Sequence, residues 1–239
     1  MQGASIIIPT LNEEKYLPML LDSLRFLPKE GWEIIVVDGG STDQTRGVVA
    51  RFANVLEPSI ILVESPRRGA SFQRNLGASN AAFPFLLFLD ADVLVKDVPA
   101  FRRYIQQSSQ ANGVTIPRYI PAESGRLAAL LFAALHAFHH LMRPIMPYAL
   151  GAVLFTPKHV FTACNGFREE LTMNEDADYC RRAQEFASIT VMCEPVNISM
   201  RRLATVGYPR MIIQYMLIAA WRTLFGDTAY NPFSYDNAH

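Results

Sequence analysis

The feature that most constrains the fold is a regular alternation of strand-like and helix-like segments through the first half of the chain. Short runs of β-branched and other apolar residues predict strands, and a helix-like segment follows each of the first three. The predicted strands are 5–9, 33–37, 60–63 and 85–89, and the predicted helices follow Asn12, follow the turn 38–43, and cover 70–82. This alternation predicts an α/β fold with a mostly parallel central sheet covered by helices on both faces.

Polar residues stand before the first two predicted helices. Asn12 precedes a segment with leucines on one face, and we expect its side chain to cap that helix. The turn 38–43 contains Ser41 and Thr42, and we expect one of them to cap the second helix.

Two acidic residues follow the fourth predicted strand. The run 85–89 is apolar throughout, and Asp90-Ala91-Asp92 comes directly after it. Ligands of open α/β sheets bind beyond the carboxyl ends of the strands. In an extended chain Asp90 and Asp92 point to the same side, and two such carboxylates suit Mg²⁺ or Mn²⁺ that carries a phosphate group. A strand that ends in a solvated acidic turn is the alternative for so short a motif.

The second half of the chain is less regular, and its elements are predicted from shorter signals. We expect strands at 113–116, 151–155, 189–192 and 196–200, a loop at 117–124, and helices at 127–142, 157–166, 175–186 and 211–225. All connections between these elements are short. The sequence therefore predicts one domain over 1–226, followed by a C-terminal tail at 227–239.

Composition excludes several classes of protein. The 239 residues contain 22 basic and 22 acidic side chains, and this balance argues against nucleic acid as a partner. Three cysteines without C-x-x-C spacing favour a reducing compartment over a disulfide framework or a zinc site. The N-terminus has no basic segment or cleavage site of a signal peptide, so we expect a cytoplasmic protein. No G-x-G-x-x-G follows the first strand, which excludes a dinucleotide-binding oxidoreductase.

Two long apolar stretches leave two interpretations open. The segments 127–142 and 211–225 are shorter than the roughly 20 residues that a membrane-spanning helix needs. They are either helices of the core or of a protein interface, or helices that contact a membrane surface. The second interpretation would place the protein at the inner face of the membrane. His136, His139 and His140 lie in the first stretch; the spacing of His136 and His140 can hold a metal, but packing or acceptor contact fits them better.

Five segments, in this order, resemble the motifs of family 2 glycosyltransferases. They are 5–13 (SIIIPTLNE), 36–43 (VVDGGSTD), 68–78 (RGASFQRNLGA), 89–92 (LDAD) and 166–178 (GFREELTMNEDAD). Each motif is weak alone, and their order along roughly 4–205 is what makes the resemblance specific. The resemblance implies the GT-A fold, with a nucleotide-binding half at about 1–116 and an acceptor-binding half at about 117–226.

The resemblance also implies which residues bind the donor, a nucleoside-diphosphate sugar linked to UDP, GDP or dTDP. Asp38 is expected to bind the nucleoside, although turn capping is the alternative for this residue. Arg68 and Gly69 precede a helix, where anions bind favourably. The full set of expected donor-binding residues is Pro9, Thr10, Leu11, Glu13, Asp38, Arg68, Gly69, Arg74, Asp90 and Ala91, with Asp92 and Asp90 as ligands of Mn²⁺ or Mg²⁺.

The last motif supplies the expected catalytic residues. An inverting transfer needs a base that deprotonates the acceptor hydroxyl, and Asp176 is the candidate. Burial would raise the pKa of Asp176 and a helix N-terminus would lower it, and the sequence leaves open which effect prevails. Glu175 either shares the catalytic role or positions the acceptor, and Asp178 is expected to face elsewhere. The alternative is that these acids only complement the start of a helix.

The chain departs from the family pattern in two places. Gly39 stands where many relatives carry a second acid or Asn, and no Gln-x-x-Arg-Trp motif of processive polymerases is evident. The second departure favours transfer of one sugar, with a lipid-linked or amphiphilic acceptor suggested by the apolar stretches. Arg201, Arg202 and Arg210 fall where a loop would close on pyrophosphate, or they are solvated surface residues. The competing functions are a sugar nucleotidyltransferase and a catalytically degenerate GT-A-like binding protein.

Overall fold

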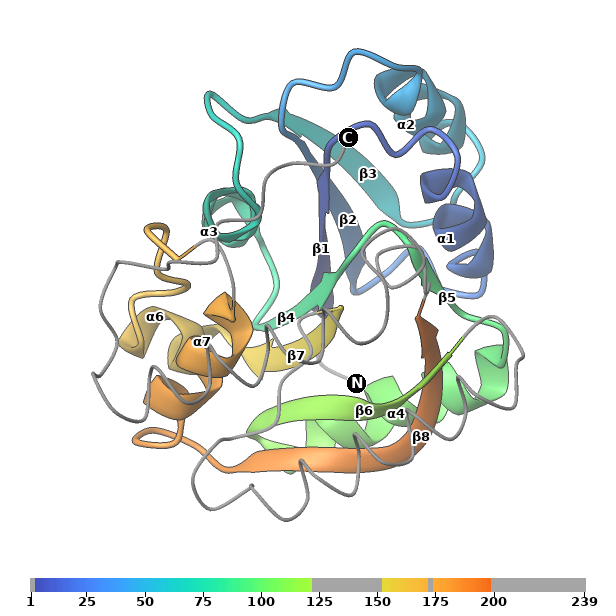
Figure 1. Ribbon diagram of the computed structural model, residues 1–239. Coiled ribbons are helices and arrows are strands. Elements are labelled where there is room, and N and C mark those ends of the chain that lie inside the picture. The colour runs from blue at the N-terminus through green and yellow to red at the C-terminus, as the bar shows by residue number, and fades with distance from the viewer. Residues whose placement is uncertain (1–2, 122–151, 172–173, 199–239) are drawn as a thin grey trace.

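The computed structural model describes residues 3–121, 152–171 and 174–198, which form one eight-stranded sheet with helices packed on it (Figure 1). The order of the strands in the sheet is β3-β2-β1-β4-β7-β6-β8-β5. The strands are β1 (Ala4–Thr10), β2 (Trp32–Asp38), β3 (Ser59–Glu64), β4 (Phe85–Leu89), β5 (Val93–Leu94), β6 (Val114–Pro121), β7 (Val153–Pro157) and β8 (Ile189–Ile198). The described helices are α1 (Leu17–Ser23), α2 (Thr45–Ala53), α3 (Ala70–Asn80), α4 (Val98–Ala111), α6 (Lys158–Ala163) and α7 (Glu175–Ala183).

The parallel centre of the sheet consists of β3, β2, β1 and β4. Every residue of β2 and β4 is buried, as expected for strands that are covered on both faces. Figure 1 shows α3 on one side of these strands and α1 with α2 on the other. β1 and β2 are in register from Ala4 opposite Trp32 to Thr10 opposite Asp38, so both strands end at the same edge. The predicted α/β fold with a mostly parallel sheet is therefore confirmed.

The second half of the chain extends the same sheet. β7 pairs antiparallel with β4, and β6 pairs antiparallel with β7. β8 then runs parallel to β6, and the short β5 pairs antiparallel with the end of β8. Because β7 lies antiparallel beside β4, the residues that precede β7 are next to those that follow β4, and Asp90 N donates to Ala152 O at 2.9 Å.

Two predictions for the second half were wrong. Residues 117–121 are not loop but the continuation of β6, and β8 is one strand where two were expected. Proline misled both predictions, because it cannot donate to the ladder of a sheet. The sheet accommodates Pro117 with a shift of register between Ile116 and Arg118, after which Arg118 lies opposite Pro195.

The helix α4 was not predicted, although its sequence carries two helix signals. The side chain of Asp97 accepts a hydrogen bond from the backbone N–H of Ala100 at 2.9 Å, which caps the helix. Phe101, Tyr104 and Ile105 then form its buried face at helical spacing.

The expected caps of α1 and α2 have another function. Asn12 lies outside α1 in a left-handed conformation (φ 56°), and its Oδ1 accepts a hydrogen bond from Thr42 N at 2.9 Å. Ser41 Oγ in turn accepts from Asn12 N at 2.9 Å. At the start of α2, Oδ1 of Asp43 accepts a hydrogen bond from Thr45 N at 2.9 Å. The predicted capping residues therefore join the loop after β1 to the loop after β2.

Several predictions fall outside the described residues. They are the helix at 127–142 with His136, His139 and His140, the helix at 211–225, Arg201, Arg202, Arg210, and the tail 227–239. Within the part of the chain that the structure describes, every helix is too short or too polar to cross a membrane.

Candidate active site

The candidate site forms where β1, β2 and β4 end. These neighbouring parallel strands are followed by three of the motif segments, so Thr10, Asp38 and Asp90 reach the same edge of the sheet. Thr10 is buried, and its carbonyl oxygen accepts a hydrogen bond from Gly39 N at 2.8 Å. Pro9 and Leu11 beside it are half-buried, so they can form the wall of a binding site. Glu13 is buried in the same loop and donates its backbone N–H to Thr45 Oγ1 at 2.8 Å.

Asp38 is fully buried and organises the turn that follows β2. Its carboxylate accepts hydrogen bonds from Gly40 N at 3.3 Å, Ser41 N at 3.1 Å and the guanidinium Nε of Arg46 at 2.8 Å. Burial by itself raises the pKa of Asp38, but the hydrogen bonds from Ser41 and Arg46 outweigh it and hold the pKa below its ordinary value. The turn-capping function considered as an alternative is thus present, and nucleoside binding by Asp38 stays a prediction.

Arg74 joins two acidic motifs that are far apart in the sequence. Its side chain is 4 % exposed, and its Nη2 and Nη1 lie 2.6 Å from Asp90 Oδ1 and 2.6 Å from Glu175 Oε1. The guanidinium also lies over the ring of Phe167, 5.5 Å from its centroid. Burial lowers the pKa of Arg74, but the two carboxylates outweigh it and raise the pKa above its ordinary value. Arg74 was expected to contact phosphate or nucleoside; its described partners are these acids.

The Asp90-Ala91-Asp92 motif is a turn, not an extended segment. Asp90 N donates to Ala152 O at 2.9 Å, and Val93 N donates back to Asp90 O at 3.1 Å. The argument that two carboxylates two residues apart share a side in extended chain therefore does not apply here. Ala91 is buried, while Asp90 and Asp92 are half-buried at the edge of the sheet.

The donor set fits a divalent ion that arrives with its substrate. Asp90 Oδ1 accepts from Arg74, and Asp90 Oδ2 accepts no hydrogen bond from any described residue. Within residues 3–121, 152–171 and 174–198, no cluster of three potential protein ligands exists. Mg²⁺ is commonly bound by one or two carboxylates together with water and substrate phosphates, which is the arrangement that Asp90 and Asp92 allow.

Asp176 is a buried carboxyl near the start of α7. Its surroundings decide whether its pKa is raised by burial or lowered by the helix N-terminus. Burial raises its pKa, and the negative charge of Glu175 raises it further. The N–H of Ala177 donates to Asp176 Oδ1 at 2.8 Å and, with the charge of Arg74, acts in the opposite direction. Burial prevails, and the pKa of Asp176 lies at about 7, well above the ordinary value of 3.8. A carboxyl with this pKa can act as a base near neutral pH.

Asp178 points away from Asp176 into a cluster of arginines. It is 1 % exposed, and its oxygens lie 2.8 Å from Arg182, 3.3 Å from Arg168 and 3.4 Å from Arg181. Arg182 also donates to the carbonyl of Gly166 at 2.8 Å. Asp178 therefore faces elsewhere, as expected, and it holds the Gly166 loop against α7.

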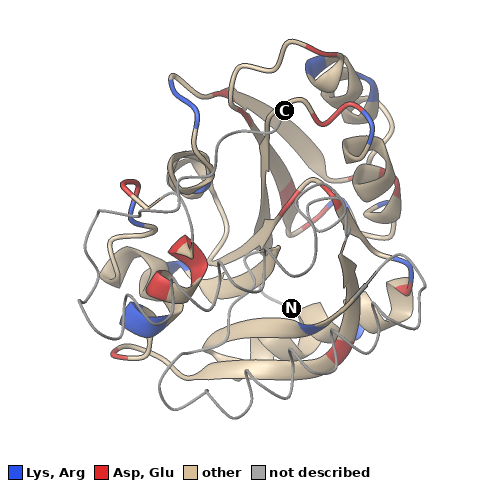
Figure 2. Cartoon of the chain, in the orientation of Figure 1, with Lys and Arg blue, Asp and Glu red and all other residues tan. Residues whose placement is uncertain are grey.

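The loop before α3 has an exposed basic side. Arg68 and Gly69 are both exposed, and Gly69 has φ 133°, a conformation that favours glycine. Arg67 pairs with Glu169 and lies over the ring of Phe72, 4.0 Å from its centroid. Figure 2 shows this basic loop and the acidic start of α7 on the same side of the molecule. Arg68 is thus placed where it can contact an anion, and anion binding by Arg68 stays a prediction.

Two polar residues of this region were not predicted. Arg46 pairs with Asp38, and no sequence signal distinguishes it from other surface arginines of an amphipathic helix. Gln73 is 4 % exposed and hydrogen-bonds the ends of β1 and β2. The signal that could have indicated Gln73 is its position, as a polar residue next to Arg74 within the motif 68–78.

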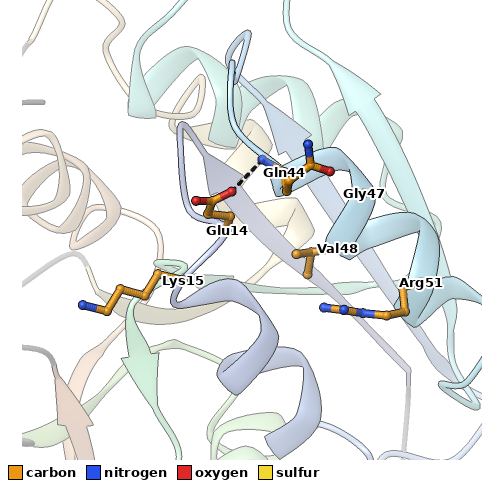
Figure 3. Close-up of a pocket in the computed structure, with 6 residues that line it drawn as sticks. All are labelled: Glu14, Lys15, Gln44, Gly47, Val48 and Arg51. Atoms are coloured by element: carbon orange, nitrogen blue, oxygen red, sulfur yellow. Dashed lines mark hydrogen bonds between the residues drawn. The ribbon is translucent and has the colours of Figure 1, made fainter.

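A separate pocket lies between the start of α1 and α2 (Figure 3). Its volume is about 570 Å³, and its lining residues are Glu14, Lys15, Gln44, Gly47, Val48 and Arg51. Glu14 Oε2 accepts a hydrogen bond from Gln44 N at 2.9 Å across it. None of the predicted site residues lines this pocket, so it is distinct from the candidate site.

A family model and curated relatives match the N-terminal part of the chain. The model described as "Glycosyl transferase family 2" matches residues 5–172. A poly(ribitol-phosphate) β-N-acetylglucosaminyltransferase, TarS of Staphylococcus aureus, is 38% identical over 108 residues, which are 42% of this chain and 19% of that protein. A PGL/p-HBAD biosynthesis glycosyltransferase of Mycobacterium bovis is 41% identical over 88 residues, which are 37% of this chain and 34% of that protein. The chain thus matches less than half of either relative.

Solved structures have the same fold as this chain. The mannosyltransferase PcManGT from Pyrobaculum calidifontis, in complex with GDP-Man and Mn²⁺, has a TM-score of 0.74 at 19% identity and covers 97% of this chain and 66% of that one. TarS residues 1–349 have a TM-score of 0.63 at 22% identity and cover 95% of this chain and 66% of that one. The same TarS fragment is also known with UDP-GlcNAc. The fold is therefore GT-A.

Proposed function

The chain belongs to glycosyl transferase family 2, and we propose that it is an inverting, metal-dependent glycosyltransferase. It moves one sugar from a nucleoside-diphosphate sugar to an acceptor hydroxyl. The observation that carries the proposal is the meeting of two distant acidic motifs at one buried arginine. Arg74 joins Asp90, at the expected metal motif, to Glu175, beside the expected base.

Asp176 is the proposed base. Its pKa of about 7 leaves a large fraction ionised at neutral pH, and the ionised form still binds a proton strongly enough to accept one from a hydroxyl as the C–O bond forms. An inverting reaction needs this one base on the face opposite the leaving group. Glu175 is held by Arg74 beside Asp176, and the charge of Glu175 contributes to the raised pKa of Asp176.

Asp90 and Asp92 are the proposed ligands of Mn²⁺ or Mg²⁺. A bound divalent ion would neutralise the charge that develops on the leaving nucleoside diphosphate. The GDP-Man and Mn²⁺ complex of PcManGT supports the assignment by similarity of fold. Arg74 holds Asp90 through Oδ1 and leaves Oδ2 as the oxygen able to bind a cation. Arg68 and Gly69 are proposed to meet the diphosphate at the start of α3.

The proposal is tested first by calorimetric binding of UDP, GDP and dTDP, each with and without Mn²⁺. We expect one nucleotide to bind with metal, and Asp90→Asn and Asp92→Asn to weaken that binding. Asp176→Asn should bind the nucleotide normally but lose about 10²-fold to 10⁴-fold in sugar transfer. Asp22→Asn is the control, because Asp22 is exposed and its ion pair is with Arg25, just after the end of α1.

The opposite results would separate the competing functions. Failure of all nucleotides to bind with metal present would support a degenerate binding protein. Release of pyrophosphate from a nucleoside triphosphate and a sugar phosphate would support a nucleotidyltransferase.

We also propose that the acceptor is lipid-linked or amphiphilic and is met at the cytoplasmic face of a membrane. The apolar stretches 127–142 and 211–225 support this, and both lie outside the described residues. Flotation of the purified protein with anionic liposomes at low salt is the expected result. A protein that stays at the bottom of the gradient would contradict membrane contact.

A further inference from the structure

Gln73 occupies the space beside Gly39, the glycine at which the chain departs from the family pattern. Gln73 comes from α3 and is 4 % exposed. A Cβ atom on residue 39 would lie 3.1 Å from both Nε2 and Oε1 of Gln73. The amide of Gln73 therefore stands where a side chain of residue 39 would begin, at the carboxyl ends of β1 and β2.

The orientation of this amide is determined by its neighbours. Nε2 of Gln73 donates to Thr10 O at 2.9 Å and to Val37 O at 2.7 Å. Both partners are carbonyl oxygens, which only accept, so the nitrogen must face them and the amide cannot flip. Gln73 consequently presents an acceptor, Oε1, on its remaining side.

This oxygen is available to a ligand. Oε1 of Gln73 accepts no hydrogen bond from any described residue. Protein atoms do not fully enclose this oxygen. Solvent therefore reaches it, although the rest of the side chain is buried. By contrast, the carboxylate of Asp38, which lies next to Gly39 at the end of β2, already accepts hydrogen bonds from Gly40, Ser41 and Arg46.

We infer that Gln73 Oε1 accepts a hydrogen bond from the ring N–H of the donor's nucleobase and so selects the class of nucleotide. This inference rests on the proposed function. Uracil, thymine and guanine carry a ring N–H on the edge that pairs, whereas cytosine carries an unprotonated ring nitrogen there. Because Gln73 Oε1 can only accept, it binds the ring N–H of uracil, thymine or guanine. With cytosine, two acceptors would face each other.

The test is the binding of UDP, dTDP, GDP and CDP to the whole protein with Mn²⁺, measured by calorimetry. We expect the unmodified protein to bind its best ring N–H nucleotide at least about tenfold more tightly than CDP, since an unpaired buried acceptor costs that much or more. Gln73→Ala should reduce this preference to within about threefold. Thermal unfolding of the variant is followed as well, because Thr10 O and Val37 O lose a donor.

A second variant moves the acceptor back to the β2 turn. Gly39 does not have the left-handed φ of its neighbour Gly40, and the atoms that crowd its Cβ position belong to Gln73. Gly39→Asp combined with Gln73→Ala should therefore fit, and we expect it to recover the preference over CDP. The matched control is Gly47→Asp with Gln44→Ala, another glycine whose Cβ would lie 3.1 Å from a glutamine Oε1, in the separate pocket. That control should leave the preference unchanged.

The outcomes distinguish this inference from the function on which it rests. If no nucleotide binds with metal, the proposed function fails. If nucleotides bind but CDP is preferred, or Gln73→Ala keeps the original preference, the inference is overturned and the proposed function stands. An equal loss of affinity for all four nucleotides would place Oε1 against the ribose and would likewise overturn it.

Discussion

The buried Arg74 forms an ion pair with the half-buried Asp90 at 2.6 Å, and the same guanidinium reaches Glu175. The pair joins α3 to the turn after β4, and its second arm joins both to α7. A charge removed from water is stable only when it is paired, so neither contact can be lost without cost to the other groups. Arg74 is thus a positioning residue that sets both the place of Asp90 and the charge around Asp176.

Replacement of Arg74 should move the pH dependence of sugar transfer. The charge of Arg74 lowers the pKa of Asp176, so Arg74→Met should raise that pKa and shift the acid limb of kcat/KM to higher pH. The variant should also lose about 3–5 kcal/mol of stability, because two carboxylates lose their partner. Arg74→Lys keeps the charge and should keep the limb near its original position. An unchanged profile in a folded Arg74→Met protein would contradict this role.

Stability should depend on pH through Asp176. Its pKa in the folded protein is about 7 against an ordinary 3.8, so the folded state binds more protons than the unfolded state between these values. The contribution of Asp176 to stability is therefore largest below the ordinary pKa and falls as pH rises toward 7, by an amount on the order of a few kcal/mol. Asp176→Asn should remove this component of the slope and be the more stable protein at pH 8. Urea unfolding at pH 5 and pH 8 measures it, and parallel slopes would refute the assignment.

Asp178 should be important for stability and not for the chemistry. Asp178→Asn leaves three arginines around a neutral amide, and we expect it to cost about 3 kcal/mol in urea unfolding. The pH profile of kcat/KM should remain in place, since Asp178 faces away from Asp176. Asp22→Asn, at an exposed pair, should change stability by less than about 1 kcal/mol. A displaced profile in Asp178→Asn would mean that Asp178 acts on the base.

Gly77 should be required for packing of α3 on the sheet. A Cβ at this position would lie 2.4 Å from Cγ2 of Ile7 and 3.1 Å from Cγ2 of Val37, both in the core. Gly77→Ala should therefore destabilise the protein by about 1–3 kcal/mol despite the better helix propensity of alanine. Gly47→Ala is the control, because its Cβ would meet only the end of the Gln44 side chain. A stable Gly77→Ala variant would show that β1 shifts to admit the methyl group.

The sheet of the first half could be predicted from the sequence because its signals are local. β4 is apolar throughout, β1 and β2 each contain a run of β-branched apolar residues, and the segments between these strands carry helical patterns or turn signals. Local signals failed where a pairing partner overrides them. Residues after Pro117 belong to β6 because β8 pairs with them across a register shift, and nothing near Pro117 in the sequence specifies that partner.

The candidate acids could likewise be predicted from their positions at the ends of predicted elements. Their contacts with one another and with Arg74 could not be predicted. The pKa of Asp176 depends on burial, on Glu175 and on Arg74, and only folding brings the last of these there. The same holds for Gln73, which stands beside Gly39 because α3 packs across β1 and β2. The sequence by itself determined the order of elements and the residue types at their ends, since both follow from short-range periodicity. Tertiary structure alone decided which charges meet and which polar atoms remain for a ligand, because hydrogen bonds and ion pairs depend on distances between residues far apart in the chain.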